Sequence, residues 1–155
     1  MSVRVIALGS AMSQDDGAAL AAARALEGEP GATIVLAGRP GPGLLDLLTP
    51  DAPVVLLDAV RAGAAPGEVV ALSLEALAGA AVASDAVSSH GLGVASALRL
   101  GAALGRALPP GRFVGMGGAR FEPGEGLSSA VAAALPEMIT AARAAVAALR
   151  EEARR

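Results

Sequence analysis

The sequence predicts an α/β fold, a three-layer α/β/α sandwich around a mostly parallel five-stranded sheet. Five short apolar runs indicate strands. Helical stretches separate most of these runs along the chain, an order typical of strand–helix–strand units. Each run is apolar throughout instead of alternating with polar residues, which is typical of parallel strands buried on both faces.

The first half of the chain predicts three strands and two helices. Gly9 ends the first apolar run, and Gly28 with Pro30 stops the Ala-rich helical stretch that follows it. Gly and Pro residues then surround a short helix, and Pro53 introduces the third strand. The predicted strands are Val3–Leu8, Thr33–Leu36 and Val54–Leu57, and the predicted helices are Gln14–Leu26 and Leu44–Leu48.

The second half predicts two more strands and two helical regions. Pro109, Pro110 and Gly111 end the first helical region, and the second shows apolar residues at spacings of three and four, as expected of a helix packed on one side. The predicted strands are Val69–Leu74 and Phe113–Met116, and the predicted helices run from about Leu92 to Leu108 and from Ser128 onward, with Pro136 beginning a second part. With no disordered linker in sight, we expect a single domain over residues 1–155.

Composition excludes several classes of protein. The 155 residues carry a net charge of −3, all 12 cations are arginines, and the two aromatic residues are Phe, so the clustered cations and stacking rings of a nucleic-acid-binding protein are missing. The absence of Cys excludes a disulfide scaffold, a thiolate nucleophile and an iron–sulfur cluster. Charges interrupt every long apolar stretch, so we expect a cytoplasmic protein without a membrane span. No coiled-coil appendage is visible, and we expect a monomer.

Candidate chemistry lies where the predicted strands end. In open α/β sheets ligands bind in the crevice beyond the carboxyl ends of the strands. Asp15 and Asp16 follow the first strand, Asp58 follows the third, and His90 lies in a Ser-Ser-His loop. Two carboxylates and an imidazole, each from a different strand end, form a mixed oxygen and nitrogen site that suits Zn, Ni or Fe. Ligand chemistry alone does not choose among these ions.

Each candidate also has a plainer interpretation. His90 is the one imidazole of the chain and could bind a metal or titrate, or could merely cap a helix. Asp58 directly follows four apolar residues, where a carboxylate is costly to bury unless it is paired or binds a cation, but it could also begin an Asx turn. Asp15 and Asp16 could simply favour the positive end of a helix dipole.

Other motifs are absent. No G-x-G-x-x-G follows the first strand, and no phosphate-binding loop with its Lys exists. A Ser-His-Asp hydrolase could use His90 and Asp58, but the chain has no G-x-S-x-G turn, and Ser88 and Ser89 would stand beside their own base in the sequence. These observations argue against dinucleotide binding, nucleotide hydrolysis and serine hydrolase chemistry.

Four segments together resemble the nickel–iron hydrogenase maturation proteases. These are Gly9–Gly17 (GSAMSQDDG), Val54–Gly67 (VVLLDAVRAGAAPG), Ser88–Gly93 (SSHGLG) and Glu122–Ser128 (EPGEGLS), the last followed by an Ala-rich stretch and Leu135-Pro136-Glu137. They occur in the order of the family and span nearly the whole chain. The resemblance implies a phosphorylase/hydrolase-like α/β/α endopeptidase of the cytoplasm.

The same resemblance implies a function and a site. Proteins of this family remove a C-terminal extension from the hydrogenase large-subunit precursor once nickel is inserted, and release of the tail lets the precursor close over its metal centre. The family's metal-contacting residues correspond to Asp16, Asp58 and His90. In this interpretation the three side chains contact nickel that the precursor presents, and the metal orients the scissile peptide, polarises its carbonyl or activates water.

Three departures from the family pattern bear on that expectation. Ser10 stands where the family usually has Asn, Arg39 ends the segment that replaces Gly-Gly-Thr, and Arg120 ends the segment that replaces G-x-E-P. The two arginines bring positive charge to a cation site, or grip a carboxylate of the substrate, with Asp15 as a further substrate contact. The alternatives are therefore a divergent, non-catalytic relative that binds a precursor without cleaving it, or another metal-assisted hydrolase of the same fold.

Overall fold

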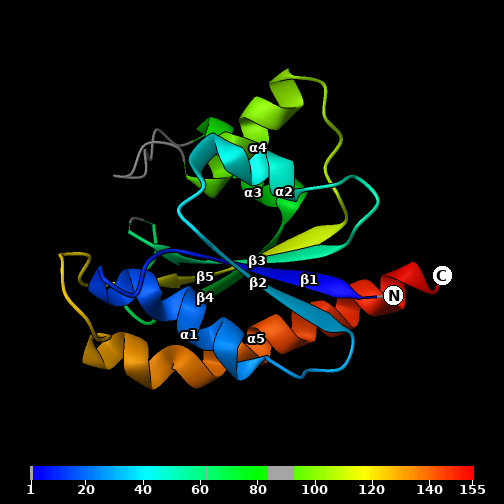
Figure 1. Cartoon of the computed structure of the whole chain (residues 1–155). Helices are drawn as coiled ribbons and strands as arrows, with labels where there is room; N and C mark the ends of the chain where they lie inside the picture. Colours follow the sequence, from blue (N-terminus) through cyan, green and yellow to red (C-terminus); the bar gives the residue numbers. More distant parts are fainter. Residues whose placement is uncertain (1, 62, 84–92) are drawn as a thin grey trace.

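A five-stranded sheet forms the middle layer of the molecule, between two layers of helices (Figure 1). The computed structural model describes residues 2–61, 63–83 and 93–155. The strand order is β2-β1-β3-β5-β4, with β1, β2, β3 and β5 parallel and β4 antiparallel to β5. The strands are β1 (Val3–Leu8), β2 (Ala32–Gly38), β3 (Val54–Val60), β4 (Val69–Ser73) and β5 (Gly111–Gly117). The predicted fold class is confirmed.

The helices cover both faces of the sheet. One layer holds α1 (Ala18–Ala25) and α5 (Ser129–Ala153), and the other holds α2 (Leu44–Leu47), α3 (Leu74–Ala83) and α4 (Val94–Ala103) (Figure 1). Two short 3-10 turns, η1 (Gln14–Gly17) and η2 (Gly41–Gly43), precede α1 and α2. Each helical layer packs its own hydrophobic cluster on the sheet.

Burial on both faces explains the uniformly apolar strands. In β1, Val5 and Ala7 belong to the cluster under α1 and α5, whereas Ile6 and Leu8 belong to the cluster on the other face. Helix α1 meets the sheet with four fully buried alanines, Ala18, Ala19, Ala22 and Ala23. Because alanine has no side chain beyond Cβ, the helix and the sheet approach closely. The alanines of α1 are therefore core residues, like the larger apolar residues of the same cluster.

The structure corrects two expected boundaries near the predicted site. The helix expected from Gln14 begins as the 3-10 turn η1 and becomes α-helical at Ala18. The third strand does not end at Leu57, because Asp58 pairs with Gly115 and the ladder continues to Val60. Asp58 is therefore a strand residue and does not begin an Asx turn.

Two further differences lie in the second half of the chain. Helix α3 was not expected, and it begins directly after β4, where the Ser73 hydroxyl accepts a hydrogen bond from the N–H of Ala76 at 3.1 Å. Helix α5 is continuous through Pro136 instead of falling into two parts. Pro136 and Ala132 are exposed, so water can hydrate the Ala132 carbonyl that the proline cannot bond.

Helix α5 is the one described helix that is long and apolar enough by composition to cross a membrane. Its apolar side packs on the sheet and on α1, with Val131, Met138, Ala142, Val146 and Leu149 buried. A core helix that is rich in alanine meets the same compositional test.

The connections of β1 place a topological switch point between β1 and β3. We call this edge of the sheet, at the carboxyl ends of its parallel strands, the crevice. From β1 the chain passes to β2 on one side, and β3 later takes its place on the other side of β1. The carboxyl ends of β1, β2 and β3 therefore meet where the connections diverge, which is where ligands bind in open parallel sheets.

Replacing Gly117 with Ala should destabilise the protein. An added Cβ would lie 2.1 Å from the carbonyl oxygen of Ala65, a main-chain atom that accepts the Glu68 N–H at 2.9 Å. Hydrogen bonds of Gly117 with Gly67 and Glu68 hold the two segments together. We expect urea denaturation to show a loss of about 1–3 kcal/mol in the free energy of unfolding. The matched control is Gly79→Ala in α3, which has open space around it and should gain about 0.5–1 kcal/mol. Equal stability of the two variants would contradict the close packing at the end of β5.

Candidate active site

Asp16 lies in the loop after β1 with its carboxylate held on one oxygen. Its Oδ2 accepts hydrogen bonds from the main-chain N–H of Ser10 at 2.8 Å and from Nε and Nη2 of Arg39 at 2.9 and 2.7 Å. Asp16 is 5% exposed. Its Oδ1 accepts no hydrogen bond from any residue that the structure describes, so one oxygen remains available to a ligand.

A glycine makes this loop possible. Gly9 has a φ of +116°, and a Cβ at this position would lie 2.0 Å from the main-chain oxygen of Asp16. Its N–H donates to the carbonyl of Gly38 at 2.7 Å, which ties the end of β1 to the end of β2. Glycine is needed both for the backbone conformation and for the close approach. The family's Asn is replaced by Ser10, whose main-chain N–H performs the contact with Asp16.

Asp58 lies beside Asp16 at the end of the neighbouring strand. Its Oδ1 accepts a hydrogen bond from the N–H of Ala59 at 2.9 Å, and among the described residues no donor bonds its other oxygen. Burial and the negative charge of Asp16 raise the pKa of Asp58 to about 7, against the opposing effects of the Ala59 N–H and of Arg39. At neutral pH this carboxyl group therefore exists in both protonation states.

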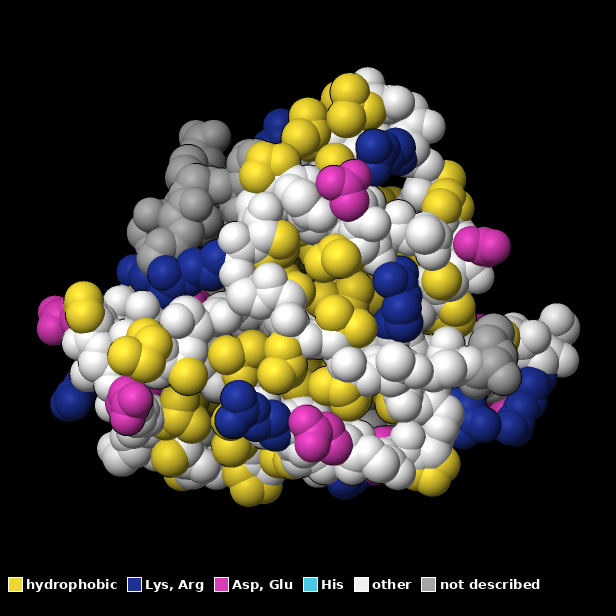
Figure 2. Space-filling model, in the orientation of Figure 1, with side chains coloured by type: hydrophobic (Ala, Val, Ile, Leu, Met, Phe, Trp, Pro, Cys, Tyr) yellow, Lys and Arg dark blue, Asp and Glu magenta, His cyan; other side chains and the backbone are white. Residues whose placement is uncertain are grey.

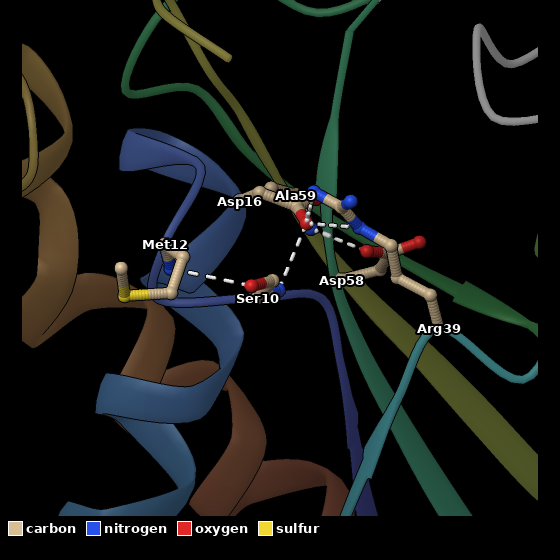
Figure 3. Close-up of polar contacts among 6 residues, drawn as sticks. All are labelled: Ser10, Met12, Asp16, Arg39, Asp58 and Ala59. Carbon is tan, nitrogen blue, oxygen red and sulfur yellow. Dashed lines mark hydrogen bonds and ion pairs between the residues drawn. The ribbon is translucent and has the colours of Figure 1, made fainter. Parts of the chain in front are cut away.

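Figure 3 shows the side chains of Asp16, Arg39 and Asp58 pointing toward one another. They come from the loop after β1, the residue after β2 and the end of β3. The structure thus brings together two of the three predicted metal ligands and one predicted substrate contact. His90, the third predicted ligand, lies outside the described residues with Ser88 and Ser89. Within the described part of the chain, no group of three or more His, Cys, Asp or Glu could hold a metal ion.

Asp15 has a different surrounding from the one expected of a substrate contact. It is fully buried. Its Oδ2 accepts hydrogen bonds from the N–H of Ala119 and of Arg120 at 2.8 and 2.9 Å and from the hydroxyl of Ser128 at 2.8 Å, while Oδ1 accepts the Ser128 N–H at 2.7 Å. Burial raises the pKa of Asp15, but these hydrogen bonds lower it more, and the net shift is downward. The expectation of direct substrate contact is corrected, because no oxygen of Asp15 reaches the surface.

Asp15 and Asp16 therefore do not act as simple helix-starting acids. Neither side chain caps η1 or α1. One carboxylate ties the loop after β1 to the segment after β5, and the other faces the crevice.

The segment after β5 carries residues that the sequence interpretation overlooked. Ser128 bonds Asp15 twice, and only its position before a helix hinted at a polar role. Arg61 lies over the ring of Phe121 at 4.2 Å, which joins the loop after β3 to this segment. Arg120 is exposed, and its N–H, which the family's Pro could not supply, is one of the donors to Asp15.

The arrangement suits cation binding and proton transfer. Two carboxylates converge in a crevice, each with an oxygen that the described residues leave unbonded, and a positive charge already lies against one of them. A carboxyl group with a pKa near 7 can accept or release a proton at neutral pH.

Comparison with known proteins gives the family. A family model described as hydrogenase maturation protease matches residues 19–145. The chain belongs to the hydrogenase maturation protease family. The predicted resemblance is confirmed, and the matched region of this maturation protease includes Arg39, Asp58 and Arg120. A sequence comparison with curated proteins found no match.

Solved structures resemble this maturation protease over nearly its full length. The hydrogenase maturating endopeptidase HybD from E. coli is 25% identical with a TM-score of 0.77, covering 98% of this chain and 94% of that chain. A solution structure of an endopeptidase from Escherichia coli is 26% identical with a TM-score of 0.78 and the same coverage. The [NiFe] hydrogenase maturation protease HybD from Thermococcus kodakarensis is 30% identical with a TM-score of 0.67, covering 93% and 98%.

Replacing Asp15 with Asn should destabilise this maturation protease. An amide group cannot accept hydrogen bonds on both of its ends, so at least one buried donor loses its partner. We expect a loss of about 2–4 kcal/mol in the free energy of unfolding by urea denaturation. The pKa of Asp15 is lower in the folded protein than the value of 3.8 in the unfolded chain. Its contribution to the free energy of unfolding is therefore present above pH 3.8 and is lost as the pH falls through the folded pKa. The exposed Asp51→Asn is the control, and a loss no larger than in that variant would refute this role for Asp15.

Replacing Asp58 with Asn should remove a pH-dependent loss of stability. The folded pKa of about 7 lies above the unfolded value of 3.8, so the folded protein holds the proton that the unfolded chain releases. The free energy of unfolding therefore falls as the pH rises between these values. At a pH above both pKa values we expect Asp58→Asn to be more stable than the parent by about 1–3 kcal/mol, as measured by urea denaturation across pH. A stability difference that does not vary with pH would contradict the raised pKa.

Proposed function

We propose that this maturation protease is an endopeptidase that removes the C-terminal extension of a nickel-loaded NiFe hydrogenase large-subunit precursor. The observation that carries the proposal is the convergence of Asp16 and Asp58 in the crevice between β1 and β3 of a maturation-protease fold (Figure 3). The Thermococcus kodakarensis relative is by name a protease of [NiFe] hydrogenase maturation, which supports the choice of substrate class.

The two carboxylates supply the chemistry that peptide hydrolysis near a metal centre needs. We assign Asp16, Asp58 and, from the family resemblance, His90 to contact with the nickel that the precursor carries, so that the metal arrives with the substrate. Hydrolysis adds water across the scissile C–N bond and leaves a carboxylate and an amine. One oxygen of Asp58 accepts no hydrogen bond from the described residues, so this carboxylate can accept the proton of the attacking water and return a proton to the leaving amine.

Arginines at the same end of the molecule suit the precursor's tail. Arg39 and Arg120 follow β2 and β5 and are exposed at the edge where these strands end. Figure 2 shows arginine side chains gathered on the left, at the end of the molecule where the parallel strands finish. Guanidinium groups bind carboxylates in a bidentate manner, so these two side chains are suited to hold acidic groups of a substrate peptide.

One observation favours a second candidate function. The guanidinium of Arg39 already bonds the predicted ligand Asp16, which is the arrangement expected if the chain binds a precursor without cleaving it. In that case the crevice is a recognition surface and no peptide bond is broken.

Incubation of the purified protein with nickel-loaded precursor decides between the two. We expect a mobility shift of the large subunit with the parent protein, and a rate reduced at least about 100-fold in Asp58→Asn and in His90→Ala. The control is Arg143→Gln, which removes the ion pair between α5 and Glu29 and should process at the parent rate. Binding of the precursor without any shift would favour the second function, and processing that survives both substitutions would contradict the assigned roles.

A further inference from the structure

Arg39 places a positive charge on the carboxylate through which Asp16 would contact a metal ion. Its Nε and Nη2 both donate to Oδ2 of Asp16, at 2.9 and 2.7 Å. The Asp16 side chain is 7% exposed, whereas that of Arg39 is 39% exposed. The ion pair thus joins a buried carboxylate to a guanidinium that reaches it from the solvent side. Burial of the carboxylate makes these charge-assisted hydrogen bonds stronger than they would be on an open surface.

The backbone determines where this arginine stands. Arg39 directly follows Gly38, which has a φ of +64°, pairs with Leu8 of β1 and accepts the N–H of Gly9. The chain therefore leaves β2 at the mouth of the crevice. Figure 3 shows the guanidinium beside the carboxylates of both Asp16 and Asp58.

We propose that Arg39 is a built-in counter-cation that keeps free divalent ions out of the crevice and yields only to a metal delivered by the precursor. The inference rests on the proposed function and concerns the selectivity of the same site. Arg39 compensates the like charges of the two acids. A free ion at the unbonded Oδ1 of Asp16 would lie beside this positive charge, and an ion at Oδ2 would have to displace it.

A metal held by a protein precursor differs from a free ion in two ways. The precursor adds its own contacts with the protease, and these offset the loss of the Arg39–Asp16 hydrogen bonds. The precursor also brings its own metal ligands. The residues of the crevice then supply only the remaining ligands of the metal. Because the Arg39 side chain is partly exposed, it can turn away without disturbing the core.

Titration calorimetry with nickel chloride alone tests the proposal without any precursor. We expect the parent protein to bind Ni²⁺ weakly, Arg39→Gln to bind it at least roughly tenfold more tightly, and Arg39→Lys, which keeps the positive charge, to stay near the parent. The double variant Arg39→Gln with Asp16→Asn should lose the gain. Thermal unfolding of each variant establishes that the protein is folded.

The matched control is Arg143→Gln. This arginine also bonds a carboxylate through Nε, that of Glu29 at 3.0 Å, and its loss should leave Ni²⁺ affinity unchanged. An affinity in Arg39→Gln within about twofold of the parent would overturn the proposal, as would an equal gain in Arg39→Lys or a gain that survives Asp16→Asn.

The two proposals fail separately. If the parent protein processes nickel-loaded precursor but Arg39→Gln shows no gain in Ni²⁺ affinity, the endopeptidase function stands and the counter-cation role is refuted. If Arg39→Gln gains affinity but no processing occurs, the role of Arg39 stands and the proposed cleavage is wrong.

Discussion

The architecture of the site depends on one buried carboxylate. Asp15 binds the main-chain N–H groups of Ala119 and Arg120 and both donors of Ser128, and so joins the loop after β1 to the segment between β5 and α5. An ionised group without solvent is stable only when its oxygens are satisfied, and here four donors satisfy them. Since Asp16 is the next residue along the chain, this interaction also determines where the crevice-facing carboxylate lies.

Charges partly compensate one another beside the carboxylate of Asp16, where the side chains of Asp58 and Arg39 also lie. The carboxylates of Asp16, after β1, and Asp58, in β3, repel each other. The guanidinium of Arg39 compensates the charge of Asp16, whereas burial and the charge of Asp16 raise the pKa of Asp58. Neither effect needs a bound ion. The crevice can therefore stay folded before a substrate arrives, while Asp58 remains close to the point at which a proton is gained or lost.

Much of this arrangement could be predicted from the sequence, for identifiable reasons. Uniform apolar runs indicated buried parallel strands, and the position of Asp58 after Val-Val-Leu-Leu placed a carboxylate at the carboxyl end of the third strand. The antiparallel direction of β4 and the helix α3 were missed because strand direction and short Ala-rich helices leave weak local signals. The burial of Asp15 could not be foreseen, since its partner Ser128 is 113 residues away. The pairing of Arg39 with Asp16 likewise depends on how the ends of β1 and β2 are joined.

The way Asp15 holds the segment after β5 also bears on how this protein can diverge. At positions 119 and 120 the carboxylate binds main-chain groups, so any residue except proline would keep the attachment. The exposed side chains of Ala119 and Arg120 take no part in this attachment, which uses only their main-chain N–H groups. Substitutions at these two positions can therefore accumulate one at a time without changing the buried contacts of Asp15.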